Sequence, residues 1–463
     1  MKMHFPLDPW ESIYIVDGAR AAVGMPVYEP LESGHATHMY GPLGTYLMGG
    51  IFEITGPSVR IGRWISLFSG LAATLLYTAL FVPRRNPLYL IVGAALFFSL
   101  HIRCMGLFTN TRPDITAYLL ASIALIAAYA AQNRRSAGMY VISAVLIVLA
   151  FLFKQTYAAA ALIPPLAVLA LRPEGWRGLI WKALIPLGAI AITGMVIKFG
   201  FPNVWFYMVD VPKQYRIFGS RVNLGLMSLL MNNPLFLATV VMVIFHIGFD
   251  RTRDPLLAWL FVTMLIGGLM GIVAFAKQGG NYNSLLMIYG PMTAFCMLTL
   301  PRVIDALAGL RPGPVVSVIT GLMLALLLST TAFGVPLSMR LAFSHAGNTS
   351  DYSRAIELAK GLDGTVLCPE EPTILLFARG KYDKNLSAEV EAIGNAYRAT
   401  VEQWLDRNAR DAQWIITVST PDLPGRLAAF MPDFGFRQVP RRELRSGYTL
   451  WRRISPSTAP GNP

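Results

Sequence analysis

Three short polar breaks between apolar segments carry residue types that suit the binding of an anion or a sugar. They read Asn110-Thr111-Arg112-Pro113-Asp114, Lys154-Gln155-Thr156 and Lys277-Gln278-Gly279-Gly280-Asn281-Tyr282-Asn283. Lysine and arginine neutralise phosphate charge, and amide side chains hydrogen-bond to hydroxyls. A purely structural interpretation is also open, because Asp114 would favour a helix start and Lys154 could extend its ammonium to a membrane interface.

Further candidate groups lie near the N-terminus and in a long break at 200–234. Asp8, Glu11 and Asp17 share one short segment. A carboxylate at the mouth of a cavity can act as general base on a hydroxyl, although acids on a solvated helix could equally just face water. In the long break, charges alternate with aromatic rings, which favours a membrane-interface belt over a carbohydrate site. The charged residues there are Asp210, Lys213, Arg216 and Arg221, and the aromatic ones are Trp205, Phe206, Tyr207 and Tyr215.

A second kind of break is rich in arginine and alternates with the first along the chain. Its members read Arg84-Arg85, Arg134-Arg135 and Asp250-Arg251-Thr252-Arg253-Asp254. Arginine between membrane spans marks the cytoplasmic face. The breaks with acids and amides therefore face outside, where we expect them to form one pocket.

The composition indicates a membrane protein. Of 463 residues, 54% are hydrophobic and 14% are charged, and the mean hydropathy is +0.50, which is too little charge for a soluble surface of this size. We attribute the net charge of +13 to topology and to attraction by anionic lipids, not to nucleic acid. The three cysteines imply no disulfide framework.

The apolar segments predict about ten transmembrane helices. They run near 58–82, 87–107, 115–132, 138–153, 156–173, 178–199, 235–249, 256–276, 284–300 and 314–337. Arg63, with Arg60, opens the first span on the external side against the charge bias, which favours a functional role.

Residues 1–57 form an external segment with two amphipathic stretches, beginning at Trp10 and Pro42, that we expect to lie flat at the outer interface. No apolar segment precedes them, so we expect a first transmembrane helix to be missing from this chain, and an in-frame stop codon directly before Met1 would refute that.

A small α/β domain is expected at 338–455, outside the membrane. Its predicted strands are Thr365–Cys368, Trp414–Ser419 and Tyr448–Trp451, and its predicted helices span 351–361, 372–379, 387–409 and 421–430. Residues 456–463 are expected to be disordered.

Taken together, these motifs resemble the GT-C glycosyltransferases, in particular bacterial members similar to protein O-mannosyltransferases and the lipid A aminoarabinose transferase. The first external loop carries the resemblance: Trp10-Glu11-Ser12-Ile13-Tyr14, Ala19-Arg20, Gly24-Met25-Pro26-Val27-Tyr28, Tyr40-Gly41-Pro42-Leu43 and Gly62-Arg63-Trp64-Ile65-Ser66. The three polar breaks fall where that superfamily has its other loop motifs, and the resemblance covers roughly residues 8–300. It implies a polytopic helical enzyme of the bacterial cytoplasmic membrane that uses a polyprenyl-phosphate sugar and inverts the anomeric centre on the outer face.

The resemblance also implies roles for individual residues. An acidic residue of the first loop, often in an Asp-Glu pair, is the base in that family; here Trp10 replaces the aspartate, so Glu11 is the first candidate, followed by Asp17 and Asp8. The leaving lipid phosphate needs cations beside it, for which we expect Arg63, Arg112 and Lys154, with Lys213 and Lys277 in reserve. Asp114, Gln155, Asn281 and Asn283 would hold the donor. With one acid in place of the pair, we expect no metal or other cofactor.

The acceptor implied is a glycan, lipid or protein of the cell envelope. Two alternatives remain open: a flippase of lipid-linked saccharides, which should place its polar residues at the membrane midplane on broken helices, and a scaffold that presents the C-terminal domain. A scaffold would tolerate Glu11→Gln and Lys154→Ala.

Overall fold

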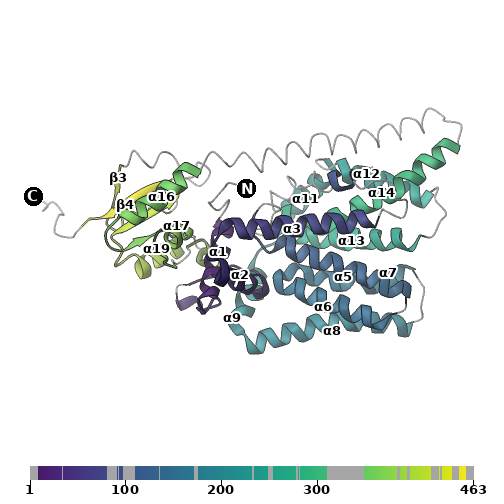
Figure 1. Cartoon of the computed structure of the whole chain (residues 1–463), viewed down its shortest axis with the longest axis horizontal. Helices are drawn as coiled ribbons and strands as arrows, with labels where there is room; N and C mark the ends of the chain where they lie inside the picture. The colour runs from purple at the N-terminus through teal and green to yellow at the C-terminus, as the bar shows by residue number, and fades with distance from the viewer. Residues whose placement is uncertain are drawn as a thin grey trace, which may run out of the picture.

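The computed structural model is an elongated molecule in which a long helical bundle carries a small mixed domain at one end (Figure 1). It describes residues 9–33, 35–80, 91, 93–96, 110–134, 136–171, 176–231, 234–248, 254–277, 280, 282–309, 349–382, 386–393, 397–418, 427, 430–440 and 448–454.

Most helices of the bundle follow the predicted apolar segments, whereas the helix Gly219–Met231 lies within the break expected at 200–234. The long helices of the bundle are α3 (Val59–Ala79), α5 (Asp114–Arg134), α6 (Ala137–Phe153), α7 (Ile163–Leu171), α8 (Trp176–Gly200), α11 (Gly219–Met231), α12 (Pro234–Gly248), α13 (Pro255–Ala276) and α14 (Leu286–Gly309). Short elements join them: the 3-10 helices η5 (Gln155–Leu162) and η7 (Tyr282–Leu285), the helices α9 (Pro202–Trp205) and α10 (Val211–Gln214), and the π-helix η6 (Phe206–Asp210). The spans expected at 87–107 and 314–337 lie largely outside the described residues. Five of the described helices are long and apolar enough to cross a membrane, which confirms a multi-pass helical protein.

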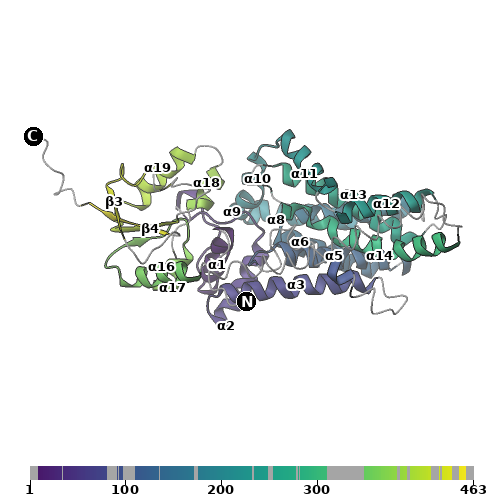
Figure 2. The ribbon, with the colours of Figure 1, turned by 90° about the horizontal axis from the view of Figure 1, so that it is seen from above.

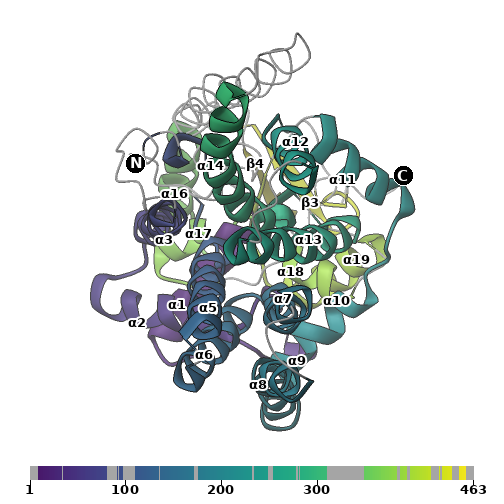
Figure 3. The ribbon, with the colours of Figure 1, turned by 90° about the vertical axis from the view of Figure 1, so that its right-hand side faces the viewer.

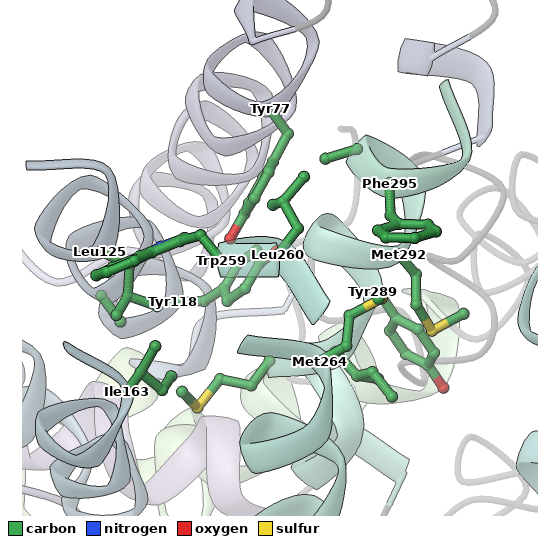
Figure 4. Close-up of a cluster of buried hydrophobic side chains, with 14 of the residues drawn as sticks. Tyr77, Tyr118, Leu125, Ile163, Trp259, Leu260, Met264, Tyr289, Met292 and Phe295 are labelled. Carbon is green, nitrogen blue, oxygen red and sulfur yellow. The ribbon is translucent and has the colours of Figure 1, made fainter. Parts of the chain in front are cut away.

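Small residues let the bundle helices approach closely, as membrane interfaces require. Helix α5 turns Ala121, Ala124, Ala128 and Ala131 inward, each at most 1% exposed, and packs tightly on α6. Seen along the long axis, α13 lies among α14, α5 and α7 (Figure 3). Aromatic and methionine side chains fill the space between α3, α5, α13 and α14 (Figure 4), and the rings of Tyr77 and Tyr118 stack there at 6.1 Å.

The described residues of the two kinds of polar break lie at opposite ends of this bundle. Helix α13 runs for 22 residues, or about 33 Å, from Asp254 at one end to Lys277 at the other. Asp254 accepts a hydrogen bond from Arg302 of α14, whereas Asn283 precedes α14 at the opposite end. The alternation in the sequence thus corresponds to two ends of the fold.

Helices α1 (Pro9–Ala22) and α2 (Pro42–Thr55) pack together between the bundle and the C-terminal domain (Figure 1). Both helices were predicted, but every residue of α1 from Glu11 to Arg20 is buried. The interpretation in which the acids of this segment merely face water is therefore wrong for Glu11 and Asp17. A short 3-10 helix, η1 (Leu31–Ser33), lies in the loop between them.

The C-terminal domain is a four-stranded sheet flanked by helices. Its strands are β1 (Val366–Leu367), β2 (Trp414–Val418), β3 (Phe436–Val439) and β4 (Tyr448–Arg453), in the order β1-β2-β4-β3, with β1 and β2 parallel and the other pairs antiparallel. Its helices are α16 (Thr349–Gly361), α17 (Thr373–Arg379), α18 (Leu386–Ile393) and α19 (Tyr397–Asn408). The expected strands are present and β3 is an addition. The helix expected at 387–409 is two helices, and the one expected at 421–430 lies almost wholly outside the described residues.

Candidate active site

A cavity of about 410 Å³ opens at the end of the bundle that faces the C-terminal domain. Its wall draws on α1, the loop before α2, the start of α5, the junction of α6 with η5, the α10 region and the facing ends of α13 and α14. The lining residues are Trp10, Met39, Tyr40, Arg112, Lys154, Gln155, Thr156, Tyr157, Ala158, Ala159, Pro212, Tyr215, Gly267, Met270, Gly271, Val273, Ala274, Lys277, Gly280, Asn283, Ser284 and Met287. Five of the predicted site residues are among them, drawn from all three polar breaks.

The side chain of Asp114 accepts hydrogen bonds from residues of the other two polar breaks. Its Oδ1 accepts hydrogen bonds from the Lys154 ammonium and from Asn283 Nδ2, the latter at 3.0 Å. Asp114 is 1% exposed, and its Oδ2 has no hydrogen-bond partner among the described residues. Buried carboxylate oxygens are normally satisfied, so a vacant one beside two cavity-lining residues is a place for a hydroxyl donor.

Lys154 is placed by the end of α6. It caps the helix with extended backbone (φ −152°, ψ 119°), so the chain turns there and η5 starts along the cavity wall. Gly41 lies against that turn, and a Cβ on it would come within 2.0 Å of the Leu152 carbonyl oxygen. The neighbouring Gln155 donates from Nε2 to the Met39 carbonyl at 2.8 Å, and its buried Oε1 has no partner among the described residues. The Lys154 ammonium also lies 5.7 Å from the centre of the Tyr40 ring.

Glu11 lies next to the cavity wall but is fully engaged by protein groups. Arg63 donates to its two oxygens, from Nε at 2.9 Å and Nη2 at 2.7 Å, and the Thr111 backbone N–H donates at 2.6 Å. Glu11 is 0% and Arg63 2% exposed. The approach depends on Gly62, because a Cβ there would come within 2.0 Å of the Thr111 side chain. Thr111 immediately precedes Arg112, so Glu11 lies close to one of the cavity cations, but Glu11 itself does not line the cavity.

Asp17 belongs to a separate buried network behind the cavity wall. It accepts from the Thr37 hydroxyl and lies 3.8 Å from Arg20, which also pairs with Glu29. Burial raises the pKa of Asp17 to about 6, against the opposing effect of Arg20. His38, 3.9 Å away, is neutral because burial lowers its pKa to about 3. Asp17 is not among the residues that line the cavity.

The remaining candidates differ in whether they line the cavity. The loop that carries Lys277 is held by Arg221, whose guanidinium donates to the carbonyl oxygens of Lys277 and Gly280, so Lys277 is fixed on the cavity wall. Lys213 is exposed and does not line the cavity. Asp8 and Asn281 lie outside the described residues.

Aromatic residues of the wall were underestimated from the sequence. Tyr215, which we interpreted as part of an interface belt, lines the cavity, and its hydroxyl lies 2.7 Å from the Met39 sulfur. Trp10 meets Tyr40 edge to face at 6.3 Å. Trp10 and Tyr40 could have been identified as cavity residues from the sequence, because both belong to the first-loop motif. Tyr215 could not, because only the fold brings it to Trp10 and Tyr40.

The charge on the wall is one-sided. Arg112, Lys154 and Lys277 line the cavity, and no acidic residue does so within the described part of the chain. Among the described residues there is also no cluster of three or more histidine, cysteine, aspartate or glutamate side chains with the proximity of a metal site. The wall therefore suits an anionic ligand that also carries an apolar portion.

Solved structures with the same architecture exist at low sequence identity. ArnT from Cupriavidus metallidurans bound to undecaprenyl phosphate aligns at a TM-score of 0.61 and 15% identity over 99% of this chain and 96% of its own. The oligosaccharyltransferase of Archaeoglobus fulgidus tethered with an acceptor peptide aligns at 0.58 and 11%, over 98% and 70%. The same archaeal enzyme, AglB, in complex with an inhibitory peptide and a dolichol-phosphate aligns at 0.55 and 12%, over 90% and 66%. A scan against protein-family models and a search of curated proteins gave no match.

These alignments extend over bundle and C-terminal domain alike. The chain therefore shares its fold with ArnT and the Archaeoglobus fulgidus oligosaccharyltransferase, as the resemblance in the sequence implied, and it is a multi-pass membrane protein.

Proposed function

We propose that this protein is a membrane glycosyltransferase that takes a monosaccharide from a polyprenyl-phosphate carrier and transfers it to a cell-envelope acceptor. One observation carries the proposal: a cavity lined by Arg112, Lys154 and Lys277 sits at one end of a GT-C bundle, with the vacant oxygen of Asp114 behind its wall. The similar structures include one bound to undecaprenyl phosphate and one in complex with a dolichol-phosphate, which supports the lipid-phosphate donor.

The chemistry follows from charge. When the glycosidic bond to the carrier breaks, negative charge builds up on the leaving phosphate, and fixed cations stabilise that charge most strongly where water is excluded. The lipid tail would extend along the apolar part of the wall, formed by Met270, Val273 and Met287. We place the site on the extracytoplasmic side of a bacterial cytoplasmic membrane, because Arg134 and Asp254, the described residues of the arginine-rich breaks, lie at the ends of α5 and α13 away from the cavity.

Two carboxylates can serve as the base that deprotonates the acceptor hydroxyl. Glu11 is the residue that the family resemblance implies, but both of its oxygens are bound by Arg63 and Thr111. Asp114 has one oxygen without a partner and contacts two cavity-lining residues. The geometry favours Asp114, and an arrangement in which donor binding draws Arg63 away from Glu11 is the alternative.

The test is transfer of radiolabelled sugar from candidate polyprenyl-phosphate donors by membranes containing the wild-type protein, Glu11→Gln or Asp114→Asn. We expect transfer by the wild type, and loss of transfer in the variant that lacks the base. Absence of transfer with every donor would contradict the proposal. Equal transfer by the wild type and Glu11→Gln would remove Glu11 from the mechanism.

A flippase of lipid-linked saccharides is the second candidate. The charged groups described above lie at the end of the bundle and not at its middle, where a transported substrate would need polar contacts. This placement favours the transferase.

A further inference from the structure

The C-terminal domain contacts two elements that form different parts of the cavity wall. Helix α17 packs on α1, and helix α18 packs on α10. Helix α1 contributes Trp10 to the cavity, and α10 contributes Pro212. Figure 2 shows α18 and α10 facing each other where domain and bundle meet. One small domain thus bridges two parts of the wall that are about 200 residues apart in the sequence.

The contact with α1 is centred on a fully buried hydroxyl. Thr373 Oγ1 accepts from Ser12 Oγ at 3.2 Å and from Tyr352 Oη at 2.9 Å, and it donates to Glu371 Oε1 at 2.6 Å. A hydroxyl has one hydrogen to donate and two lone pairs, so every bond that Thr373 Oγ1 can form is made. The Thr373 backbone N–H also lies 3.4 Å from Ser12 Oγ. Ser12 and Thr373 are both 0% exposed.

Apolar contacts surround this polar centre. Leu376 of α17, 6% exposed, belongs to the same cluster as Tyr14, Ile15 and Val16 of α1. On the other side, Ala388 of α18 packs in the cluster that contains Tyr207, Met208 and Val211. Burial of apolar surface stabilises the contact but does not fix the relative position of the two helices. A buried hydroxyl that makes all its hydrogen bonds does fix this position, because a shift would leave buried polar groups without partners.

Ser12 directly follows Trp10 and Glu11, which both take part in the candidate site. Trp10 forms the wall and Glu11 holds Arg63 and Thr111, so a shift of Ser12 displaces both within one turn of α1. We propose that the C-terminal domain is a clamp that sets the position of α1 relative to α10, and that Thr373 is its positioning residue. This inference rests on the proposed transferase function and gives the C-terminal domain a role within it.

The experiment compares three variants of the full-length protein. Thr373→Val keeps the side-chain shape and removes all three hydroxyl bonds. Thr373→Ser keeps the hydroxyl. Thr417→Val is the matched control, because Thr417 is 2% exposed in the same domain and its hydroxyl accepts a hydrogen bond from Trp451 Nε1 at 3.1 Å, away from α1. The readouts are hydrogen exchange of α1 (residues 9–22) and the kcat and KM of sugar transfer.

For Thr373→Val we expect α1 to exchange about tenfold faster, consistent with the loss of buried hydrogen bonds. We expect kcat to fall by between about tenfold and a hundredfold. The KM for the donor should change little, because Lys154 and Lys277 are not on α1. Thr373→Ser should resemble the wild type, and Thr417→Val should leave both readouts unchanged.

The outcomes separate this inference from the proposed function. If Thr373→Val and Thr417→Val behave alike in α1 exchange, the clamp is refuted whether or not transfer is detected. If α1 exchange rises and kcat stays constant, the clamp exists but does not position the site, which also overturns the proposal. If the wild type transfers no sugar, the proposed function fails while hydrogen exchange still decides the clamp.

Discussion

Glu11 and Arg63 are 52 residues apart in the sequence and form a two-point ion pair that is buried from solvent (Nη2–Oε2 2.7 Å). Arg63 lies on the first long helix of the bundle and Glu11 on the helix beneath the C-terminal domain. The pair therefore ties the membrane part to the domain interface, and it neutralises two charges that would be costly to bury alone.

Breaking this pair should destabilise the protein. In Arg63→Met the buried Glu11 carboxylate loses the guanidinium that binds both of its oxygens, and loss of one partner of a buried pair costs about 3–5 kcal/mol. We expect a clearly lower Tm of the purified protein in detergent. Glu53→Gln, at an exposed acid of α2, is the control and should leave the Tm unchanged. An Arg63→Met protein as stable as the control would mean that the pair contributes nothing net.

Asp114→Asn should abolish most of the transfer activity. General-base catalysis contributes typically about 10²–10⁴-fold in rate, and asparagine retains the shape and an oxygen that can accept from Lys154. We expect a kcat loss in that range. Because the Lys154 ammonium also loses its counter-charge, the Tm should fall, and the rates are compared at a temperature at which both proteins are folded. A Glu11→Gln protein that is folded and loses more activity than Asp114→Asn would return the base to Glu11.

Lys277→Ala should weaken donor binding. Lys277 lines the cavity, and a hydrogen bond to a charged group contributes about 1.5–3 kcal/mol, so the KM for the lipid-phosphate donor should rise at least about tenfold. Lys213→Ala removes the same charge from an exposed position off the cavity. Initial rates at varied donor concentration distinguish the two, and equal effects of both substitutions would exclude a specific phosphate contact by Lys277.

Asp17 should make stability depend on pH. Burial raises its pKa from 3.8 to about 6, so between these values the folded protein binds the proton more tightly than the unfolded chain does. The free energy of unfolding therefore falls as the pH rises from about 4 to about 6 and is constant above that. Asp17→Asn should remove this fall, with a Tm advantage over the wild type that grows up to pH 6. If the Asp17→Asn protein also loses transfer activity at unchanged Tm, Asp17 has a role beyond structure.

Transfer should persist in EDTA. In the resemblance of the sequence to the GT-C glycosyltransferases, Trp10 stands where those proteins carry the aspartate of an acidic pair. Glu11 is held by Arg63 and Thr111, so we expect the cations of the cavity to neutralise the charge of the leaving phosphate. The check is the initial rate of transfer after chelation and again after Mg²⁺ or Mn²⁺ is added back. Loss of activity in EDTA with recovery on either metal would overturn this expectation.

The sequence by itself determined the membrane bundle, the alternation of its polar breaks and the residue types at its site. These follow from local rules: apolar segments of membrane length are helices, and charges at their ends must find water or a partner. For the same reason, Arg112, Lys154 and Lys277 could be predicted to meet at one end of the bundle.

Only the tertiary structure decided which acid is enclosed, which has a vacant oxygen, and what the C-terminal domain holds. The sequence shows only that Glu11 and Asp114 are both carboxylic acids. What each carboxylate can do depends on the groups that hydrogen-bond to it in the fold. Arg63, Thr111, Lys154 and Asn283 arrive there from distant segments. The hydroxyl of Thr373 meets Ser12 across 361 residues, and no periodicity in the chain encodes that contact.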